Sequence, residues 1–398
     1  MSSTRLSIRL SSAIAHHRRL AEVAAGRRPS RLWLHPCSFE ASRAQLSTAT
    51  SDMAKNPIHI LGAGSIGCLV GAQLSQQGFP VTFLQRSPPP SPTSPVLLQL
   101  IRSCGGSLEF PVKVESTHQP PSTASAQPID RLIVTTKAHQ LSSALASLGP
   151  RFDLNHTALV VIQNGYGQHL TPSSRLQSTS TCTGLGWGST NNGAYLTPAP
   201  SPTIWRSVVH AGIGQYYFGP ISLADPLASR GSEPCAIHLA SMWPTSTPTL
   251  LHDLAHALPS ATLHETSTAM TRVLLHKLAV NALINALTAT HKVRNGQLLH
   301  PTYVPVMRQL ADECAAVLCA TYPGIFTLSG EQVFAMAEHV CELTSRNFSS
   351  TYQDVWERGE VPRELEFVHG TIVGWGRRAG VSTRTHEEVW DRAVRAGA

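Results

Sequence analysis

The sequence contains no cysteine pair with CxxC spacing and no HExxH segment. Its eight cysteines are scattered from Cys37 to Cys341, whereas zinc sites are usually recognised by such paired cysteine or histidine ligands. We therefore expect no metal site. A chain of 398 residues without a secretory signal is also expected to keep its cysteines as free, mostly buried thiols rather than as disulfides.

The sequence also lacks a long uninterrupted apolar run. A membrane-spanning helix needs about 20 predominantly apolar residues, whereas here the hydrophobic 42% of the residues are interspersed with polar ones. The composition is typical of a soluble globular protein, and the length is sufficient for two domains with separate cores. No membrane partner is expected.

Acidic residues are scarce in the first 50 positions, which contain eight arginines but only Glu22 and Glu40. This segment carries most of the formal charge of +7, so the net charge gives little reason to expect a nucleic-acid partner. Segments rich in arginine, serine and alanine with few acids are typical of mitochondrial transit peptides. We expect residues 1–55 to be a largely disordered leader that directs the protein to the mitochondrial matrix. The alternative is a basic tail without a targeting role on a cytoplasmic protein.

A strand, a glycine-rich turn, a helix and a second strand follow the leader in that order. The first strand is predicted over Pro57–Leu61, the helix extends to about Gly78, and the second strand covers Pro80–Leu84. This order gives a GxGxxG segment the context that dinucleotide binding requires. The alternative is an ordinary glycine-rich turn. The segment itself is Gly62-Ala63-Gly64-Ser65-Ile66-Gly67.

Each glycine of this segment has an expected role. Gly62 permits the tight turn, Gly64 lets the backbone approach a pyrophosphate, and Gly67 allows the helix to pack closely on the strand. The first N–H groups of the following helix have no partner within the helix and are available to the anion.

The acidic residue of NAD-selective sites is missing. Such sites usually carry an acid about 20 residues beyond the glycines, where it binds the ribose 2′-hydroxyl. Here the second strand ends at Gln85 and Arg86. Because an arginine can pair with a 2′-phosphate, the sequence favours NADPH. The alternative is an exposed arginine that contacts no cofactor.

Further polar residues follow two buried strands. Arg131–Thr136 is followed by Lys137, and Ala158–Ile162 is followed by Gln163 and Asn164. Ligands of open α/β sheets lie beyond the carboxyl ends of the strands, so Lys137 and Asn164 are candidate ligand contacts.

The rest of the first half has weaker patterns. Two Pro/Ser-rich stretches, residues 87–95 and 116–128, are predicted surface loops. Residues 182–219 alternate polar and apolar side chains, which indicates mixed or antiparallel strands such as 203–210 and 215–218. Residues 220–248 show no clear period and are interpreted as an insertion. A helix near 250–258 and a strand near 261–264 complete a Rossmann-type domain over residues 56–266.

From Ser267 onward the periodicity is helical. A helical domain is therefore predicted over residues 267–398, with the active site in the cleft between the two domains. Thr327, Ser329 and Thr383 are plausible helix caps. After the first helix, helices are expected over about 303–321, 329–346, 364–379 and 385–396.

The first of these helices is apolar except for a polar stripe of Lys277, Asn281 and Asn285. A spacing of four places successive members on one face, about 6 Å apart. The stripe could bind a polar ligand. Alternatively, Lys277 extends to solvent and the amides are satisfied within a helical core.

Together these residues indicate carbonyl reduction. Hydride transfer to a carbonyl carbon leaves negative charge on the oxygen, and the ammonium of Lys277 can stabilise that charge and donate a proton. Burial lowers a lysine pKa towards the working pH, which suits such a donor.

The sequence resembles the ketopantoate reductase (2-dehydropantoate 2-reductase) family from Pro57 to about Gly380, and within it a eukaryotic, fungal-like member. Asn192-Gly193-Ala194 departs from the family's more usual His-Gly-Ala turn, and the Pro/Ser-rich loops are longer. The motifs that carry the resemblance are the glycine segment, Thr136-Lys137-Ala138, Gln163-Asn164-Gly165, Lys277-Leu278-Ala279-Val280-Asn281 with Asn285, Asn295-Gly296, Asn347-Phe348-Ser349-Ser350 with Gln353-Asp354, and Arg363-Glu364-Leu365-Glu366 ahead of Gly370.

The resemblance implies NADPH-dependent reduction of 2-dehydropantoate to (R)-pantoate, a step towards coenzyme A. It assigns Lys277 as the proton donor and Glu364 as the acid at the nicotinamide end, which also contacts the cofactor. The implied substrate contacts are Asn164, Asn281, Asn285, Asn295 and Ser350, and the implied cofactor contacts are the glycine segment, Arg86, Lys137, Asn164 and Ala194.

The sequence leaves several alternatives open. Ser350 and Asn295 are also plausible cap or turn residues, and Glu366 competes with Glu364 for its assignment. The substrate could be another 2-oxo acid, or the chain could be an NADP-binding sensor without turnover. The oligomeric state, monomer or homodimer, is left open.

Overall fold

The computed structural model describes residues 56–86, 95–103, 105–117, 127–165, 184–201, 203–222, 226–227, 237–242 and 245–397. The predicted leader lies outside the described residues. So do most of the two predicted Pro/Ser-rich loops and much of the predicted insertion after residue 220.

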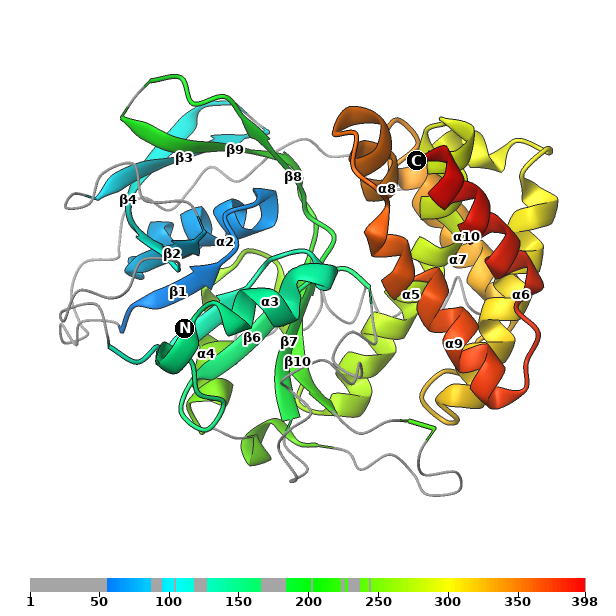
Figure 1. Cartoon of the computed structure of the whole chain (residues 1–398), viewed down its shortest axis with the longest axis horizontal. Coiled ribbons are helices and arrows are strands. Elements are labelled where there is room, and N and C mark those ends of the chain that lie inside the picture. The colour runs from blue at the N-terminus through cyan, green and yellow to red at the C-terminus, as the bar shows by residue number, and fades with distance from the viewer. Residues whose placement is uncertain are drawn as a thin grey trace, which may run out of the picture.

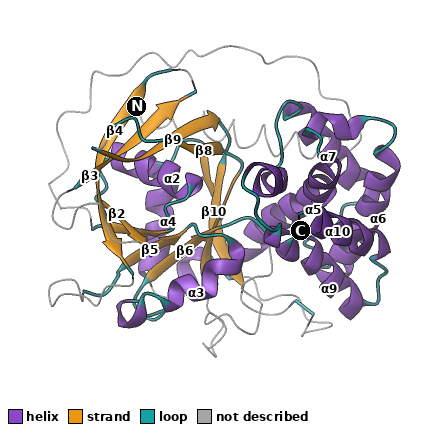
Figure 2. Cartoon of the chain, turned by 45° about the horizontal axis from the view of Figure 1, so that its top comes forward, coloured by secondary structure: helices purple, strands orange, loops and turns teal. Residues whose placement is uncertain are grey.

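Within the described residues, eleven strands form one sheet in the order β11-β10-β7-β6-β5-β1-β2-β4-β3-β9-β8 (Figures 1 and 2). Most of the predicted strands are confirmed with small shifts at their ends. The strands are β1 (Ile58–Leu61), β2 (Val81–Gln85), β3 (Val96–Arg102), β4 (Ser107–Ser116), β5 (Arg131–Val134), β6 (Ala158–Ile162), β7 (Gly184–Thr190), β8 (Gly193–Thr197), β9 (Ile204–Gly212), β10 (Tyr216–Ser222) and β11 (Ala261–Leu263).

The central strands β6, β5, β1, β2 and β4 are mutually parallel, and β7 continues this arrangement beside β6. In β6 every residue is buried, as is typical of parallel strands that are covered on both faces. Because these strands run in the same direction, their carboxyl ends lie at one edge of the sheet. The residues that follow β1, β2, β5 and β6 therefore lie near one another, as the sequence predicted.

The sheet curves around the helix α2 (Ser65–Gln76), as Figure 2 shows. The helix contacts β1 and β2 on one side and β3, β4, β8 and β9 on the other. No strand was predicted for β3 and β4, which pair antiparallel to each other. The alternation of Leu108, Phe110, Val112 and Val114 was the available signal, because residues two apart lie on one face of a strand.

The two faces of the sheet belong to different apolar cores. On one face, α2 and α4 (Ser246–Ala257) cover Ile60, Ile133 and Val160. On the other face, α3 (Leu141–Ala146) and α5 (Ser267–His291) cover Leu132, Leu159 and Trp187. The second core continues into the helical domain, so one apolar core joins the sheet to the helices.

The helix α5 is the axis of the second half. Its side chains contact β10 on one side and the helices α6, α7 and α10 on the other (Figure 1). By length and composition α5 could cross a bilayer, but 72% of its most apolar window is buried in the protein. Its apolar composition is therefore accounted for by the core.

The predicted helical half is confirmed, with two corrections. The predicted helix over 364–379 begins only at His369, because residues 363–367 form a 3₁₀ turn, η8, after Pro362. The helix predicted to reach residue 346 ends at Leu343. The helices after α5 are α6 (Val304–Thr321), α7 (Gly330–Leu343), α8 (Ser350–Tyr352) with the π-helical turn η7 (Gln353–Glu357), α9 (His369–Ala379) and α10 (Arg384–Ala396).

Of the three predicted caps, Ser329 is confirmed. Its hydroxyl accepts a hydrogen bond from the Gln332 N–H, and the Gln332 side chain accepts one from the Ser329 N–H, which is a capping box. Thr383 stands before α10 without a side-chain cap bond. Thr327 precedes no helix directly; the helix nearby is capped by Ser329.

Candidate active site

The glycine turn joins β1 to α2 in the conformation that its sequence predicted. Gly62 has φ +116°, and a Cβ there would lie 2.8 Å from the Thr136 nitrogen. A Cβ on Gly67 would lie 2.0 Å from the Gly62 carbonyl oxygen. At both positions the neighbouring backbone leaves no room for a side chain. The fold itself therefore requires glycine there, without any ligand.

Gly64 differs from these two glycines because the protein leaves open space beside it. A Cβ on Gly64 would meet nothing within 4 Å, and the residue is exposed at the N-terminus of α2. Within the described part of the chain no side-chain cap bond is made at that end of the helix, so its first N–H groups are available to an anion. These features fit a dinucleotide pyrophosphate, with Ala63, Ser65 and Ile66 contributing backbone around it.

Arg86 directly follows β2, next to the glycine turn. Leu84 pairs in register with Leu61, so Gln85 and Arg86 extend past the point where β1 ends. The side chain of Arg86 is exposed. An exposed guanidinium at this position can pair with a phosphate on the 2′-oxygen of a bound ribose.

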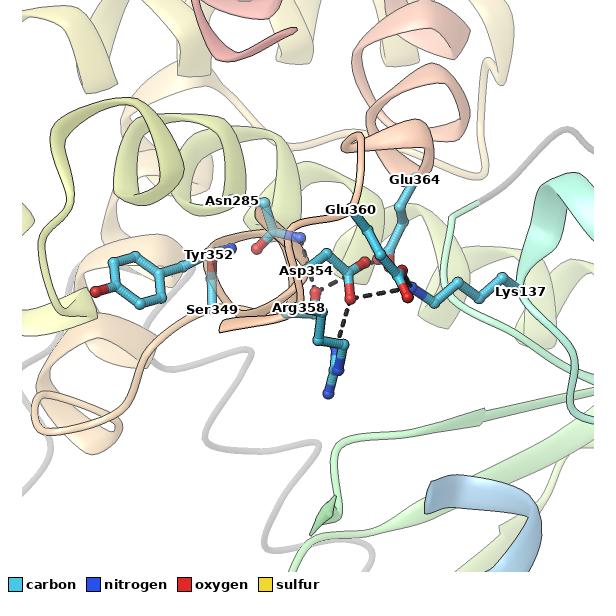
Figure 3. Close-up of polar contacts among 9 residues, drawn as sticks. Lys137, Asn285, Ser349, Tyr352, Asp354, Arg358, Glu360 and Glu364 are labelled. Carbon is cyan, nitrogen blue, oxygen red and sulfur yellow. Dashed lines mark hydrogen bonds and ion pairs between the residues drawn. The ribbon is translucent and has the colours of Figure 1, made fainter. Parts of the chain in front are cut away.

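Lys137 lies three residues beyond the end of β5, in a segment whose preceding residues are fixed by hydrogen bonds. Thr135 donates to the Gly62 carbonyl oxygen (2.7 Å), and Gln163 donates to the Thr136 carbonyl oxygen (2.7 Å). The Lys137 ammonium forms ion pairs with Asp354, at 3.0 Å, and with Glu360 (Figure 3). Both acids belong to the helical domain, so Lys137 joins the two domains.

Lys277 donates a hydrogen bond from Nζ to the carbonyl oxygen of Thr190, at 2.7 Å. Thr190 is the last residue of β7, so the ammonium of α5 is held at the edge of the sheet. Burial lowers the pKa of Lys277 to about 8, although the nearby Glu364 carboxylate acts in the opposite direction. A lysine with this pKa is protonated at neutral pH and releases its proton far more readily than an exposed one.

Asn285, Ser350 and Glu364 form a chain of polar contacts. The Asn285 amide donates to the Ser350 hydroxyl, which donates to a Glu364 carboxylate oxygen, each at 3.5 Å. Burial raises the pKa of Glu364 and the Asp354 carboxylate adds to this effect, whereas Lys277 lowers it. Figure 3 shows Glu364 close to Lys137 and Asp354. The polar groups of both domains therefore converge on one region.

Two alternatives from the sequence are decided by these contacts. The cap of α8 is Ser349, whose hydroxyl accepts the Tyr352 N–H, and the neighbouring Ser350 faces Glu364 instead. Glu366 is exposed whereas Glu364 is partly buried and contacts Ser350, so of these two glutamates Glu364 is the one that faces this region; its contact with the cofactor stays a prediction.

The remaining candidates lie at the edges of this region or outside it. Asn281 stands on the same face of α5, one turn after Lys277. Asn164 follows β6, and its neighbour Gly165 lies so close to the helical domain that a Cβ there would be 2.8 Å from Phe367 Cβ. Ala194 lies on β8, where it pairs with His210.

Asn295 is not joined to the other candidates by the hydrogen bonds of the described residues. Its amide nitrogen donates to the Thr344 hydroxyl, at 2.9 Å, and its backbone N–H donates to the Asn347 carbonyl oxygen, at 3.0 Å. These contacts hold the turn η6 (Asn295–Leu299) against the end of α7. A substrate contact for Asn295 stays a prediction.

Three residues of this region had no role in the sequence analysis. Thr190 contributes only a backbone carbonyl oxygen, which no residue type specifies. Asp354 was part of a motif but received no function, although a buried carboxylate indicates a partner of opposite charge. Glu360 lies in an irregular segment between η7 and η8 and carries no sequence signal.

Comparison with known proteins gives two matching family models. The model described as "Ketopantoate reductase PanE/ApbA" matches residues 58–222, and "Ketopantoate reductase PanE/ApbA C terminal" matches residues 269–395. The 2-dehydropantoate 2-reductase of Vibrio cholerae is 29% identical over 349 residues, covering 84% of this chain and 99% of the relative. The enzyme of the same name from Saccharomyces cerevisiae is 27% identical and covers 80% and 88%.

Solved structures show the same fold. The crystal structure of a probable 2-dehydropantoate 2-reductase from Bacillus subtilis superposes with a TM-score of 0.60 at 24% identity. It covers 85% of this chain and 99% of that chain. The arrangement of a Rossmann-type domain followed by a helical domain is therefore shared over most of this chain and nearly all of that one.

Proposed function

The chain belongs to the ketopantoate reductase family, and on that premise we propose that it reduces 2-dehydropantoate to (R)-pantoate with NADPH. The observation that carries the proposal is the position of Lys277. It is a lysine with a pKa lowered to about 8 and lies near the Glu364 carboxylate, with its ammonium held at the end of β7. The other domain carries a glycine turn that fits a dinucleotide.

The reaction needs a hydride from a cofactor and a proton from the protein. A nicotinamide dinucleotide bound at the glycine turn supplies the hydride that a carbonyl carbon accepts. Lys277 donates the proton to the carbonyl oxygen and stabilises the negative charge that develops there. The Thr190 carbonyl oxygen orients the ammonium. Asn281, Asn285 and Ser350 provide uncharged hydrogen-bonding groups for the substrate oxygens.

Glu364 is expected to hold other groups in place rather than to donate the proton. Its raised pKa, caused first by burial, favours the protonated form more than in an exposed glutamate. The Glu364 carboxyl accepts a hydrogen bond from the Ser350 hydroxyl, so it can hold that hydroxyl in place for the substrate while its other oxygen remains available to the cofactor.

The substrate is tested by NADPH oxidation with 2-dehydropantoate and a panel of aryl and branched 2-oxo acids. We expect the largest kcat/KM for 2-dehydropantoate. A clearly larger value for another 2-oxo acid would keep the reaction type and replace the substrate. Absence of turnover with every member of the panel would contradict the proposal itself.

The preference for NADPH is assigned to Arg86. Replacing Arg86 by alanine is expected to raise the Kd for NADPH roughly tenfold to a hundredfold, because a charge-assisted contact to the 2′-phosphate is lost. The Kd for NADH should change less than about twofold. Fluorescence titration with both dinucleotides measures this. Arg102→Ala removes another exposed arginine and serves as the control. If Arg86→Ala raised the Kd for NADPH and for NADH equally, Arg86 would not contact the 2′-phosphate.

We also propose that the chain is a eukaryotic, fungal-like member of the family and that its arginine-rich leader directs it to mitochondria. The composition of residues 1–50 supports this. A fusion of residues 1–60 to a fluorescent reporter tests it, and a diffuse cytosolic signal would overturn it. The oligomeric state stays a prediction of monomer or homodimer.

A further inference from the structure

Lys137 lies between two carboxylates of the helical domain. Its ammonium contacts Asp354 Oδ1 at 3.0 Å and also contacts Glu360 (Figure 3). Burial alone would lower the pKa of Lys137, but the hydrogen bonds that its ammonium donates to Glu360 and Asp354 raise it. The lysine is therefore charged at neutral pH, and two of its three donors are directed to the helical domain.

The two carboxylates are held very differently. The Asp354 side chain is only 6% exposed and also pairs with Arg358, so it is a fixed part of the helical domain. The Glu360 side chain is 50% exposed and lies between Gly359, with φ +65°, and the turn η8. Because an exposed ion pair contributes little and is easily exchanged for water, Glu360 is the partner that can leave.

Lys137 also lies where the cofactor is expected. It follows β5 at the same sheet edge as the glycine turn, and Thr135, two residues earlier, donates to the Gly62 carbonyl oxygen. A dinucleotide brings negatively charged phosphates to this edge. Glu360 would then repel the ligand and compete with it for the same ammonium, since like charges raise the free energy and opposite charges lower it.

We propose that Glu360 is a positioning residue that pairs with Lys137 in the cofactor-free protein, and that this ion pair breaks when the dinucleotide binds. Asp354 keeps its contact throughout, so Lys137 exchanges one carboxylate for the cofactor without leaving its place. Glu360 thereby lowers cofactor affinity and assists release of the used cofactor. This inference rests on the proposed function, because it requires the cofactor of that reaction to contact Lys137.

The test compares Glu360→Gln with the wild type in the full chain, using fluorescence titration with NADPH at low and high ionic strength. Glu360→Gln keeps the shape of the side chain and removes the competing charge. We expect the Kd for NADPH to fall roughly twofold to fivefold at low ionic strength, as is typical of an exposed ion pair. The gain should shrink in high salt, which screens exposed charges. Glu357→Gln removes a nearby exposed acid and is the matched control.

A double-mutant cycle separates this role from a general effect of charge or folding. Lys137→Met should weaken NADPH binding, and Glu360→Gln added to it should give no further gain, because the ammonium for which the two anions compete is gone. The inference is overturned if Glu360→Gln leaves the Kd unchanged. It is equally overturned if Glu357→Gln has the same effect, or if the gain persists in the Lys137→Met background.

The failure of this inference can be told apart from failure of the proposed function. If the wild type reduces 2-dehydropantoate but the Glu360 effects are absent, only the inference fails. If NADPH binds and the Glu360 effects appear without turnover of any 2-oxo acid, the proposed function fails and the competition stands. A wild type that binds no dinucleotide overturns both.

Discussion

Lys277→Ala is expected to lower kcat for 2-oxo acid reduction by roughly 10²- to 10⁴-fold, the usual contribution of a positioned acid. Loss of the ammonium removes both the proton donor and the charge that stabilises the developing oxyanion. The Kd for NADPH should change less than about twofold, because Lys277 bonds to Thr190 and the glycine turn lies elsewhere. Steady-state kinetics and a dinucleotide titration measure the two quantities.

Two further variants sharpen this prediction. Lys277→Arg keeps a positive charge but has a pKa too high for proton donation, so kcat should stay low. Lys113→Ala removes an exposed lysine of β4 and should leave kcat unchanged. If Lys277→Ala reduced its substrate at the wild-type rate, the proton would have to come from another group; if Lys277→Arg restored the rate, charge alone would be sufficient.

Gly64→Ala is expected to raise the Kd for NADPH more than about tenfold. In the protein alone the added Cβ meets nothing within 4 Å, so the fold should accept it. The free energy of unfolding should fall by less than about 1 kcal/mol, the usual cost of alanine at a helix N-cap. The methyl group instead occupies the space through which the backbone approaches the pyrophosphate. Dinucleotide titration and thermal unfolding without cofactor measure the two effects.

Gly67→Ala provides the contrast within the same turn. Its Cβ would lie 2.0 Å from the Gly62 carbonyl oxygen and 2.5 Å from the Thr135 hydroxyl. The backbone must shift, and an overpacked site of this kind typically loses about 1–3 kcal/mol or more of stability. We expect Gly67→Ala to be destabilised without any ligand, whereas Gly64→Ala is not. If Gly64→Ala bound NADPH like the wild type, the dinucleotide would not lie across this turn.

The elements that the sequence predicted correctly are those with strong local patterns. The run Ala158–Ile162 is apolar throughout and forms a strand buried on both faces, and the glycine segment between β1 and α2 shows positive φ at Gly62. In contrast, β3 and β4 depend on pairing with each other and with β9 and β2. The pairings with β2 and β9 bring together residues far apart in the sequence, so the alternation along β4 indicates a strand but not its partners.

The candidate site was predictable to a similar degree. The spacing of four correctly placed Lys277 and Asn285 on one side of α5, and both make polar contacts there. The partner of Lys277 is a backbone oxygen, Thr190 O, which carries no side-chain signal. The contact between Lys137 and Glu360 joins residues from different domains. It depends on where the segment between η7 and η8 packs, which the local sequence does not specify.

Lys277 is expected to act as the proton donor at a pKa lowered by burial to about 8. The decisive measurement is kcat/KM for 2-dehydropantoate with saturating NADPH from about pH 6 to pH 10. Only the protonated lysine can donate, so kcat/KM should be constant below the pKa and fall tenfold per pH unit above about pH 8. A profile that stays flat to pH 10, or the same decline in residual activity of Lys277→Ala, would contradict this role for Lys277.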